Sequence, residues 1–219
     1  VPEKGTPLFL IHGWEGHTGN FGALVEPLVK QGFRILGFDA PAHGKSSTGR
    51  TDMFEYAVFL KLMIEQYQPR VLLSHSFGTT STALALRALG DYILDQWIMI
   101  ASPYTFHSRI ETLGKLYSVP RRTLTALGPI VEERSGERIQ RLNFRRYAPF
   151  LVQVKNVLVL HSKSDSVVPF SYAEHIHEAL EQSQLIALDD LGHFGILWSP
   201  DLIRFVEQQV LPNHIGNKS

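Results

Sequence analysis

The chain of 219 residues contains no cysteine. This absence excludes disulfide bonds, a thiolate nucleophile and cysteine-ligated metals. It also fits a reducing compartment, so we expect a cytoplasmic protein. Neither sign of charge is in excess, because 21 Lys and Arg stand against 21 Asp and Glu. The net charge therefore gives no reason to expect nucleic acid or a charged membrane surface as a partner.

Long hydrophobic runs are also missing from the sequence. No uninterrupted apolar stretch approaches the roughly 18 residues that a membrane-spanning helix needs, so we expect no membrane span. Hydrophobic residues nevertheless make up 44% of the chain and charged residues 19%, which is typical of a globular protein with one sizeable core. We therefore predict one domain over residues 1–219.

Short apolar runs alternate along the chain with segments of helical character. The runs, which we predict as strands, are residues 8–11, 33–38, 71–73, 97–101, 157–160 and 184–188. The predicted helices between and after them are residues 21–30, 53–67, 79–89, 173–180 and 201–209. Near-continuous apolar strands that alternate with helices are typical of a mostly parallel sheet covered on both faces. The pattern predicts a doubly wound α/β fold.

The alternation is interrupted between residues 104 and 152. This segment contains several arginines, no convincing strand, and helical periodicity in places. We predict a helical cap that is inserted into the α/β domain. The alternative is an ordinary long crossover whose arginines form a solvated face.

Ser76 lies shortly after the apolar run 71–73 and shortly before a predicted helix. A sharp turn between strand and helix would expose its hydroxyl as a nucleophile. The surrounding sequence is Ser74-His75-Ser76-Phe77-Gly78, whereas the usual pattern is G-x-S-x-G. Ser74 is small enough for a tight crossing at this turn, although it is not sterically equivalent to glycine.

A nucleophilic serine needs a base that takes its proton and a group that orients the base. His193 follows the last predicted strand and has a side chain suited to proton transfer near neutrality. Asp165 follows the run 157–160 and would orient the histidine, although it could also be a turn or N-cap residue. His161, at the end of the same run, is the second candidate for a functional histidine. The order serine, acid, histidine, each after a different strand, favours the catalytic role, because the carboxyl ends of parallel strands meet at one edge.

The other predicted site residues concern the oxyanion and the substrate. The glycine-rich loop after the first strand could bring a backbone N–H to the serine, so we predict an oxyanion hole formed by the N–H groups of Trp14 and Phe77. His75 is expected to line the substrate pocket or to pack beside the nucleophile. Phe106 and Tyr117 of the cap are expected to line an apolar acyl pocket or to pack the cap onto the core.

Four features, in this order, resemble the α/β-hydrolase superfamily. They are the His12-Gly13 loop, the turn at residues 39–46 that is similar to the family's D-x-P-G-H-G-x-S, the elbow at Ser76, and the pair Asp165 and His193. In the turn, Ala42 replaces a common glycine. The family usually has one or two strands before the His-Gly loop, whereas only about ten residues precede it here. We expect a sheet shortened at that edge or a sequence that lacks its beginning.

The resemblance implies a Ser-Asp-His triad, a cap inserted after the equivalent of the family's sixth strand, and no metal or organic cofactor. The chain is most similar in character to small capped carboxylesterases. That similarity implies hydrolysis of a carboxylic ester with a small or medium acyl group through an acyl-enzyme. The same layout would serve a thioesterase, a lactonase or a carbon-carbon bond hydrolase. Outside enzymes, the alternatives are a ligand-binding protein on a hydrolase scaffold and a structural interaction protein with an inert site.

Overall fold

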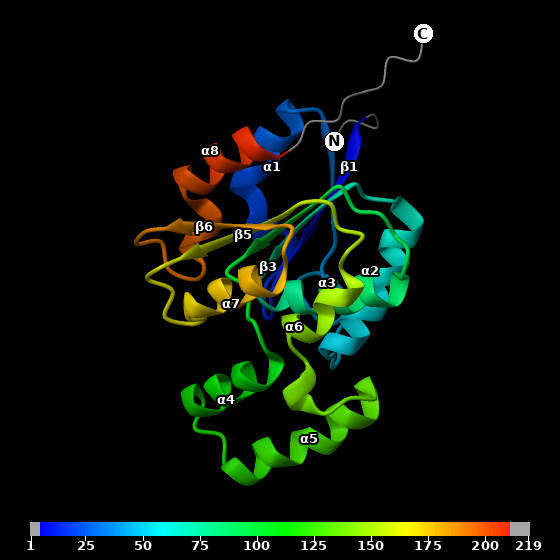
Figure 1. Ribbon diagram of the computed structural model, residues 1–219, viewed down its shortest axis with the longest axis vertical. Coiled ribbons are helices and arrows are strands. Elements are labelled where there is room, and N and C mark those ends of the chain that lie inside the picture. The colour runs from blue at the N-terminus through cyan, green and yellow to red at the C-terminus, as the bar shows by residue number, and fades with distance from the viewer. Residues whose placement is uncertain (1–4, 211–219) are drawn as a thin grey trace.

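Six parallel strands form one sheet at the centre of the structure (Figure 1). The computed structural model describes residues 5–210, apart from the side chains of residues 109, 113 and 116. The strands are β1 (Thr6–Ile11), β2 (Phe33–Gly37), β3 (Val71–His75), β4 (Gln96–Ile100), β5 (Val157–Ser162) and β6 (Ser183–Leu188). Their order across the sheet is β2-β1-β3-β4-β5-β6, and every neighbouring pair is parallel.

Helices cover both faces of this sheet (Figure 1). One face carries α1 (Gly22–Lys30) and α8 (Pro200–Gln209), and the other carries α2 (Met53–Tyr67), α3 (Phe77–Leu89) and α7 (Ser171–Ala179). The strands and helices predicted outside the cap are therefore all present, with ends that differ by at most two residues. The prediction of a doubly wound α/β fold is confirmed.

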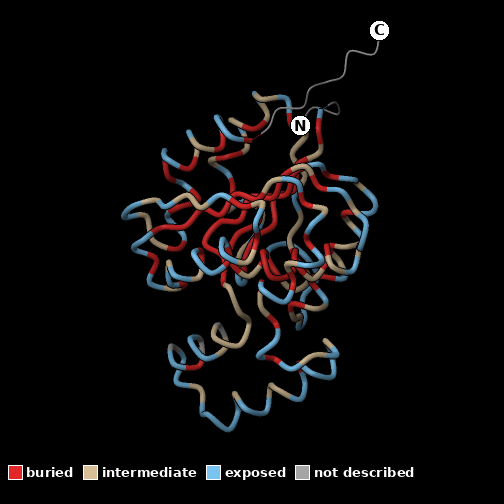
Figure 2. The backbone as a smooth tube through the Cα atoms, in the orientation of Figure 1, coloured by how far each residue is buried: buried red, intermediate tan, exposed pale blue. Residues whose placement is uncertain are grey.

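The alternation of side chains along each strand divides the core into two hydrophobic clusters. Leu8 and Leu10 of β1 pack in the cluster that includes residues of α1 and α8. Phe9 and Ile11 of the same strand pack in the cluster that includes residues of α2, α3 and α7. Successive side chains of a strand point to opposite faces, so one strand supplies both clusters. Figure 2 shows that the buried backbone is concentrated in the sheet and on the inner sides of these helices.

The chain between β4 and β5 is helical, as predicted for the cap. It contains α4 (Phe106–Leu116), α5 (Arg121–Ser135), α6 (Phe144–Tyr147) and two short 3-10 turns, Ile139–Arg141 and Ala148–Phe150. The helices α4 and α5 extend away from the sheet (Figure 1) and are mostly exposed or half-buried (Figure 2). In contrast, Phe144 and Tyr147 of α6 are buried in the core.

The start and the end of the cap are joined by backbone hydrogen bonds. Thr105 and Asn143 form an antiparallel bridge. The N–H of Phe106 donates to the carbonyl of Leu142 at 3.0 Å. Because these contacts close the segment at its base, the helices α4 and α5 form a loop-like projection whose two ends meet beside the sheet.

Two ion-pair groups connect the cap to the helices below it. Arg87 of α3 and Arg146 both pair with Glu137, with N–O distances of 2.7 Å and 3.3 Å. Arg134 of α5 lies 3.0 Å from Asp52, which caps the N-terminus of α2. One arginine of the segment, Arg134, and one acid, Glu137, thus pair with residues of the α/β domain, so the charged residues of the cap do not form only a solvated face. None of the helices in residues 5–210 combines the length and the apolar character that crossing a bilayer would require.

The close packing of the first turn of α3 against the end of β1 can be tested at Gly78. A Cβ added to Gly78 would lie 2.4 Å from the carbonyl oxygen of His12, which is a backbone atom and cannot rotate away. We expect Gly78→Ala to lower the free energy of unfolding by about 1–3 kcal/mol. Gly128→Ala in α5 is the matched control, because a Cβ there would have no atom within 4 Å. Urea unfolding measures both variants, and an unchanged free energy for Gly78→Ala would contradict the packing.

Candidate active site

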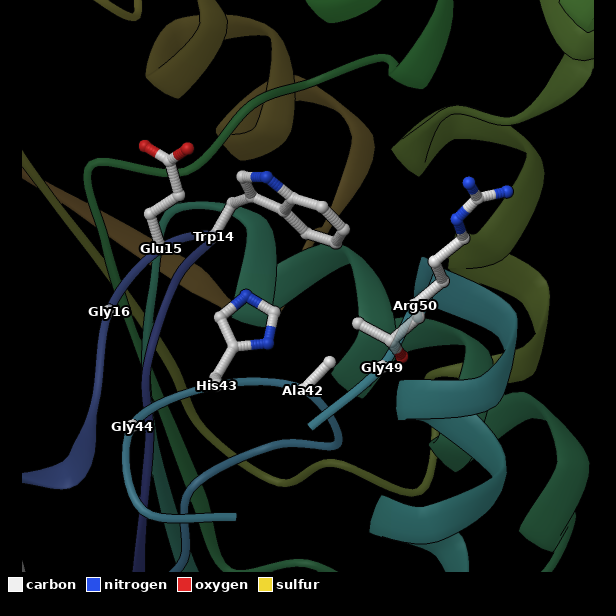
Figure 3. Close-up of a pocket in the computed structure, with 9 residues that line it drawn as sticks. Trp14, Glu15, Gly16, Ala42, His43, Gly44, Gly49 and Arg50 are labelled. Carbon is white, nitrogen blue, oxygen red and sulfur yellow. The ribbon is translucent and has the colours of Figure 1, made fainter. Parts of the chain in front are cut away.

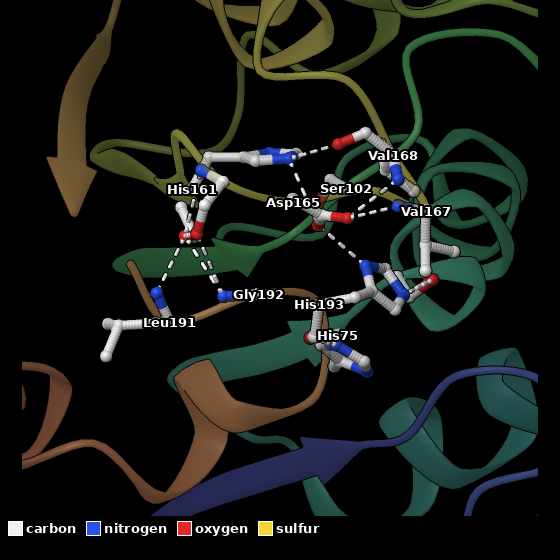
Figure 4. A network of polar contacts seen from close by, with 12 residues as sticks. His75, Ser102, His161, Asp165, Val167, Val168, Leu191, Gly192 and His193 are labelled. Atoms are coloured by element: carbon white, nitrogen blue, oxygen red, sulfur yellow. Dashed lines mark hydrogen bonds and ion pairs between the residues drawn. The ribbon is translucent and has the colours of Figure 1, made fainter. Parts of the chain in front are cut away.

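Ser76, Asp165 and His193 come together at the carboxyl edge of the sheet, where the chain leaves β3, β5 and β6. The Oγ of Ser76 lies 3.0 Å from Nε2 of His193. The Nδ1 of His193 lies 2.7 Å from Oδ2 of Asp165 (Figure 4). Their exposed fractions are 5%, 7% and 5% in chain order. A hydroxyl, an imidazole and a carboxylate in this arrangement can move the serine proton onto the imidazole and stabilise the resulting cation.

The backbone at Ser76 makes the sharp turn that the sequence predicts. Its φ of 50° and ψ of −125° lie in a region that residues other than glycine rarely occupy. The turn is held from both sides, because the N–H of Ser76 donates to Ile100 and its carbonyl accepts from the N–H of Thr79, each at 2.9 Å. The helix α3 begins at Phe77, immediately after this turn, and not at Thr79 as predicted.

Asp165 is surrounded by hydrogen-bond donors. Its Oδ1 accepts from the N–H groups of Val167 and Val168, each at 2.8 Å. Its Oδ2 accepts from His193, and Nε2 of His161 lies 3.3 Å from the same oxygen (Figure 4). Burial would raise the pKa of Asp165, but the contacts with His161 and His193 outweigh it and hold the pKa well below its usual value. The carboxylate is therefore ionised at neutral pH.

The loop after β1, which carries the first predicted oxyanion donor, passes beside the nucleophile. The carbonyl of Gly13 accepts from Nδ1 of His12 at 2.8 Å and from the N–H of Gly16 at 3.1 Å. In a trans peptide the N–H points opposite to the carbonyl, so the N–H of Trp14 is directed away from these two donors. A Cβ added to Gly13 would lie 3.1 Å from Cβ of Ser76, which places this loop next to the serine.

The second predicted oxyanion donor is the N–H of Phe77. Phe77 is the first residue of α3, and N–H groups in the first turn of a helix have no partner inside the helix. The rings of Trp14 and Phe77 lie 5.0 Å apart. The two residues whose N–H groups we predict to bind an oxyanion are thus neighbours in the structure.

His12 orients the loop after β1, a role that the sequence did not suggest. Its Nε2 accepts from the N–H of Ala40 at 2.9 Å, so Nδ1 carries the proton that is donated to Gly13. Burial lowers the pKa of His12, which favours this neutral form. The hydroxyl of Tyr56 donates to the carbonyl of His12 at 3.1 Å. The only sequence signal for His12 was its place beside Gly13 in the family-like loop.

His75 lies beneath the predicted base. Its Nε2 donates to the backbone carbonyl of His193 at 3.0 Å, and the residue is 3% exposed. Burial lowers the pKa of His75 to about 3, and the neighbouring His193 adds to this effect. The side chain is therefore neutral and supports the loop that carries His193 (Figure 4). Of the two expectations for His75, this placement matches packing beside the nucleophile and not the lining of a substrate pocket.

A model of the alpha/beta hydrolase family matches residues 8–204. The chain belongs to this family. The AB hydrolase superfamily protein YisY of Bacillus subtilis is 23% identical over 238 residues, which cover 86% of this chain and 85% of that protein.

Two solved structures show the same fold. The esterase EaEST from Exiguobacterium antarcticum has a TM-score of 0.71 and 22% identity, with 94% of this chain and 91% of that chain covered. The putative non-heme bromoperoxidase BpoC from Mycobacterium tuberculosis has a TM-score of 0.70 and 15% identity, with 93% and 91% covered. Membership of the family supports a hydrolase. The same fold occurs in proteins that are named for different activities, here an esterase and a bromoperoxidase.

The serine that replaces the first glycine of the hydrolase elbow pattern has its own polar contacts. The Oγ of Ser74 accepts from Nε1 of Trp97 at 2.9 Å and lies 2.9 Å from Oγ1 of Thr79. All three residues are completely buried. A glycine at this position would leave the indole N–H without this acceptor, and buried polar groups are rarely left unpaired.

The family-like turn at residues 39–46 is fixed by Asp39. Its carboxylate accepts from the N–H and the hydroxyl of Thr18 and from the N–H of Lys45, at 2.8 to 2.9 Å. Burial opposes ionisation, but these donors lower the pKa of Asp39 to about 2. Ala42 has a φ of 59°, in the left-handed region that favours the glycine common in the family.

A cavity of about 560 Å³ lies between this turn and the predicted oxyanion loop (Figure 3). Residues 14–16, 42–44 and 49–51 line it. Trp14 is 42% exposed, and its ring lies 5.0 Å from that of His43. The volume is within the range of small-molecule sites. Among residues 5–210, no group of three or more His, Asp or Glu side chains is arranged to hold a metal ion.

The two cap residues predicted to contact substrate lie in different surroundings. Phe106 begins α4 and is half-buried, with its ring 6.4 Å from that of Phe77. Tyr117 follows α4 and is 64% exposed. In the described part of the chain it shares no hydrogen bond or ring contact with the triad. The structure thus brings Phe106, but not Tyr117, toward the nucleophile.

The contact between Ser74 and Trp97 can be measured by a double-mutant cycle. We expect Ser74→Ala to lower the free energy of unfolding by about 1–3 kcal/mol, because a buried indole N–H loses its acceptor. In the Trp97→Phe background the same substitution is expected to cost less, since phenylalanine has no N–H. Urea unfolding of the four proteins gives the coupling energy. Equal costs in both backgrounds would show that the hydrogen bond does not carry the effect.

Proposed function

We propose that this hydrolase is a serine esterase that cleaves the carboxylic ester of a small or medium acyl substrate through an acyl-enzyme. The observation that carries the proposal is the continuous contact from Ser76 Oγ through His193 to the ionised Asp165. The serine lies on a strained turn, the loop after β1 passes beside it, and the esterase EaEST has the same fold.

Acylation begins when Oγ of Ser76 attacks the ester carbonyl and Nε2 of His193 takes the hydroxyl proton. The carbonyl oxygen becomes an oxyanion, which the N–H groups of Trp14 and Phe77 stabilise. As the tetrahedral intermediate collapses, the bond to the alcohol breaks. His193 then gives its proton to the departing alkoxide, and the acyl group remains on Ser76.

Deacylation repeats these steps with water as the nucleophile. His193 takes a proton from water, the hydroxide oxygen bonds to the acyl carbon, and the bond to Oγ breaks. The proton returns to Ser76 and the carboxylic acid leaves. Asp165 stays ionised throughout and stabilises the protonated imidazole in both halves of the reaction.

The first test compares wild type with Ser76→Ala on p-nitrophenyl acetate, butyrate and octanoate. We expect Ser76→Ala to reduce kcat/KM at least about a thousandfold, because removal of the nucleophile leaves only the residual effect of the oxyanion hole and binding. Ser47→Ala, at an exposed serine, is the matched control and is expected to retain activity. Circular dichroism establishes that all three proteins are folded.

The alternatives are distinguished by other acyl substrates and by a serine-directed label. Faster turnover of thioesters or lactones than of the matched esters would identify the protein as a thioesterase or a lactonase. Labelling of Ser76 by a fluorophosphonate without turnover of any acyl substrate would favour a ligand-binding protein on the hydrolase scaffold. Wild-type turnover that survives in Ser76→Ala would contradict the proposed nucleophile.

Phe106 provides a test of the acyl pocket. Its ring lies close to that of Phe77, so we propose that it contacts the acyl chain. Phe106→Ala is expected to raise KM for the octanoate ester about tenfold by removing apolar contact, with little change for acetate. Tyr117→Ala, an exposed side chain of the same segment, is the comparison. A similar effect of Tyr117→Ala would extend the pocket to the end of α4, and no effect of either variant would place the acyl group elsewhere.

A further inference from the structure

A second histidine faces the carboxylate of the triad. His161 lies near the end of β5 and has no exposed surface. Its Nε2 lies 2.9 Å from the carbonyl oxygen of Val168 and 3.3 Å from Oδ2 of Asp165 (Figure 4). The proton transfers described above do not use this residue, although it is completely buried against the acid that orients His193.

The surroundings of His161 determine which ring nitrogen carries the proton. Both neighbours of Nε2 are acceptors, so Nε2 must be the protonated nitrogen. The Nδ1 atom is buried, and no hydrogen-bond partner for it exists in the part of the chain that the structure describes. A proton at Nδ1 would therefore have no acceptor. His161 is a fixed donor and not a proton relay.

This single N–H acts on both oxygens of Asp165. By donating to the carbonyl of Val168, it fixes the loop whose N–H groups at Val167 and Val168 hold Oδ1 at 2.8 Å. The same N–H places partial positive charge 3.3 Å from Oδ2. With Oδ1 held by the loop and Oδ2 bounded by His161, the carboxylate has one orientation in which Oδ2 accepts from His193.

We propose that His161 is a positioning residue of the triad, which fixes the Asp165 carboxylate and limits how much of its charge acts on His193. The role rests on the proposed function, because it concerns the same proton transfer. The titratable groups that face Asp165 are His161 from β5 and His193 from the loop after β6, and His75 from β3 also acts on it. Because burial keeps His75 neutral, it supplies no positive charge that could replace the N–H of His161 beside Asp165.

The test compares two amide substitutions. The amide nitrogen of His161→Gln reaches the place of Nε2, whereas the shorter side chain of His161→Asn reaches only the place of Nδ1. We expect His161→Asn to lower kcat about tenfold with little change in KM, because the substrate is bound but the base is misplaced. The acidic limb of kcat/KM against pH is expected to move to higher pH by about half a unit. A carboxylate with fewer donors stabilises the protonated form of its partner imidazole more strongly.

If His161→Gln restores both kcat and the pH profile, the positioning role is supported. His177→Asn, at an exposed histidine of α7, is the matched control. A folded His161→Asn variant with the kcat and pH profile of wild type would overturn the inference. Equal defects in the asparagine and glutamine variants would also overturn it, because they would show a structural role alone. Circular dichroism and thermal unfolding establish folding.

A readout without substrate separates this inference from the proposed function. The proton between Nδ1 of His193 and Oδ2 of Asp165, which lie 2.7 Å apart, is expected to give a low-field nuclear magnetic resonance signal in the free protein. We expect the signal to shift or broaden in His161→Asn and to return in His161→Gln. If turnover did not require Ser76, the proposed function would fail, whereas this signal would still test whether His161 positions the carboxylate. An unchanged signal in His161→Asn would contradict the positioning role itself.

Discussion

The left-handed backbone at Ser76 is the constraint on which the rest of the site depends. A φ of 50° at a serine costs on the order of 1–3 kcal/mol, and it persists only where the surrounding structure enforces it. Here β4 holds the N–H of the turn, and α3 starts directly after it. Because α3 starts so early, its first turn meets the loop after β1, where only a glycine fits at position 78. One strained residue thus fixes the helix, the loop and the predicted oxyanion donors relative to each other.

Buried histidines hold the loops at this edge of the sheet by donating hydrogen bonds to backbone carbonyls. His12, His75 and His161 each donate to a backbone carbonyl, and in His12 the second nitrogen accepts from a backbone N–H. Among the histidines of residues 5–210, only His193 lies between a hydroxyl and a carboxylate, where both the neutral and the protonated imidazole have a partner. Similar side chains therefore serve different purposes, because their neighbours determine which nitrogen carries the proton.

The sequence predicted those parts of the site that follow from strand order. Ser76, Asp165 and His193 each come after an apolar run, and parallel strands end at a common edge, so their proximity could be expected. The contact of Ser74 with Trp97 could not, because it depends on strand register: Leu72 pairs with Trp97, and Ser74 is its diagonal neighbour. The placement of His75 depends on the distant loop that carries His193, and that of His161 depends on how the chain turns back between residues 161 and 168. Tyr117 was predicted to line the acyl pocket or to pack the cap because it is an aromatic residue of the cap. The residue type does not determine where the end of a projecting helix lies.

The closed base of the cap gives the fold a modular character. Because the two ends of the segment meet at Thr105 and Asn143, a helix pair of another length or composition can be accommodated without moving β4 or β5. Changing the length of a closed loop costs little free energy, since loop entropy varies only slowly with length. The projecting helices and the residues at the sheet edge can therefore change separately, the former through exchange of the insert and the latter through point changes.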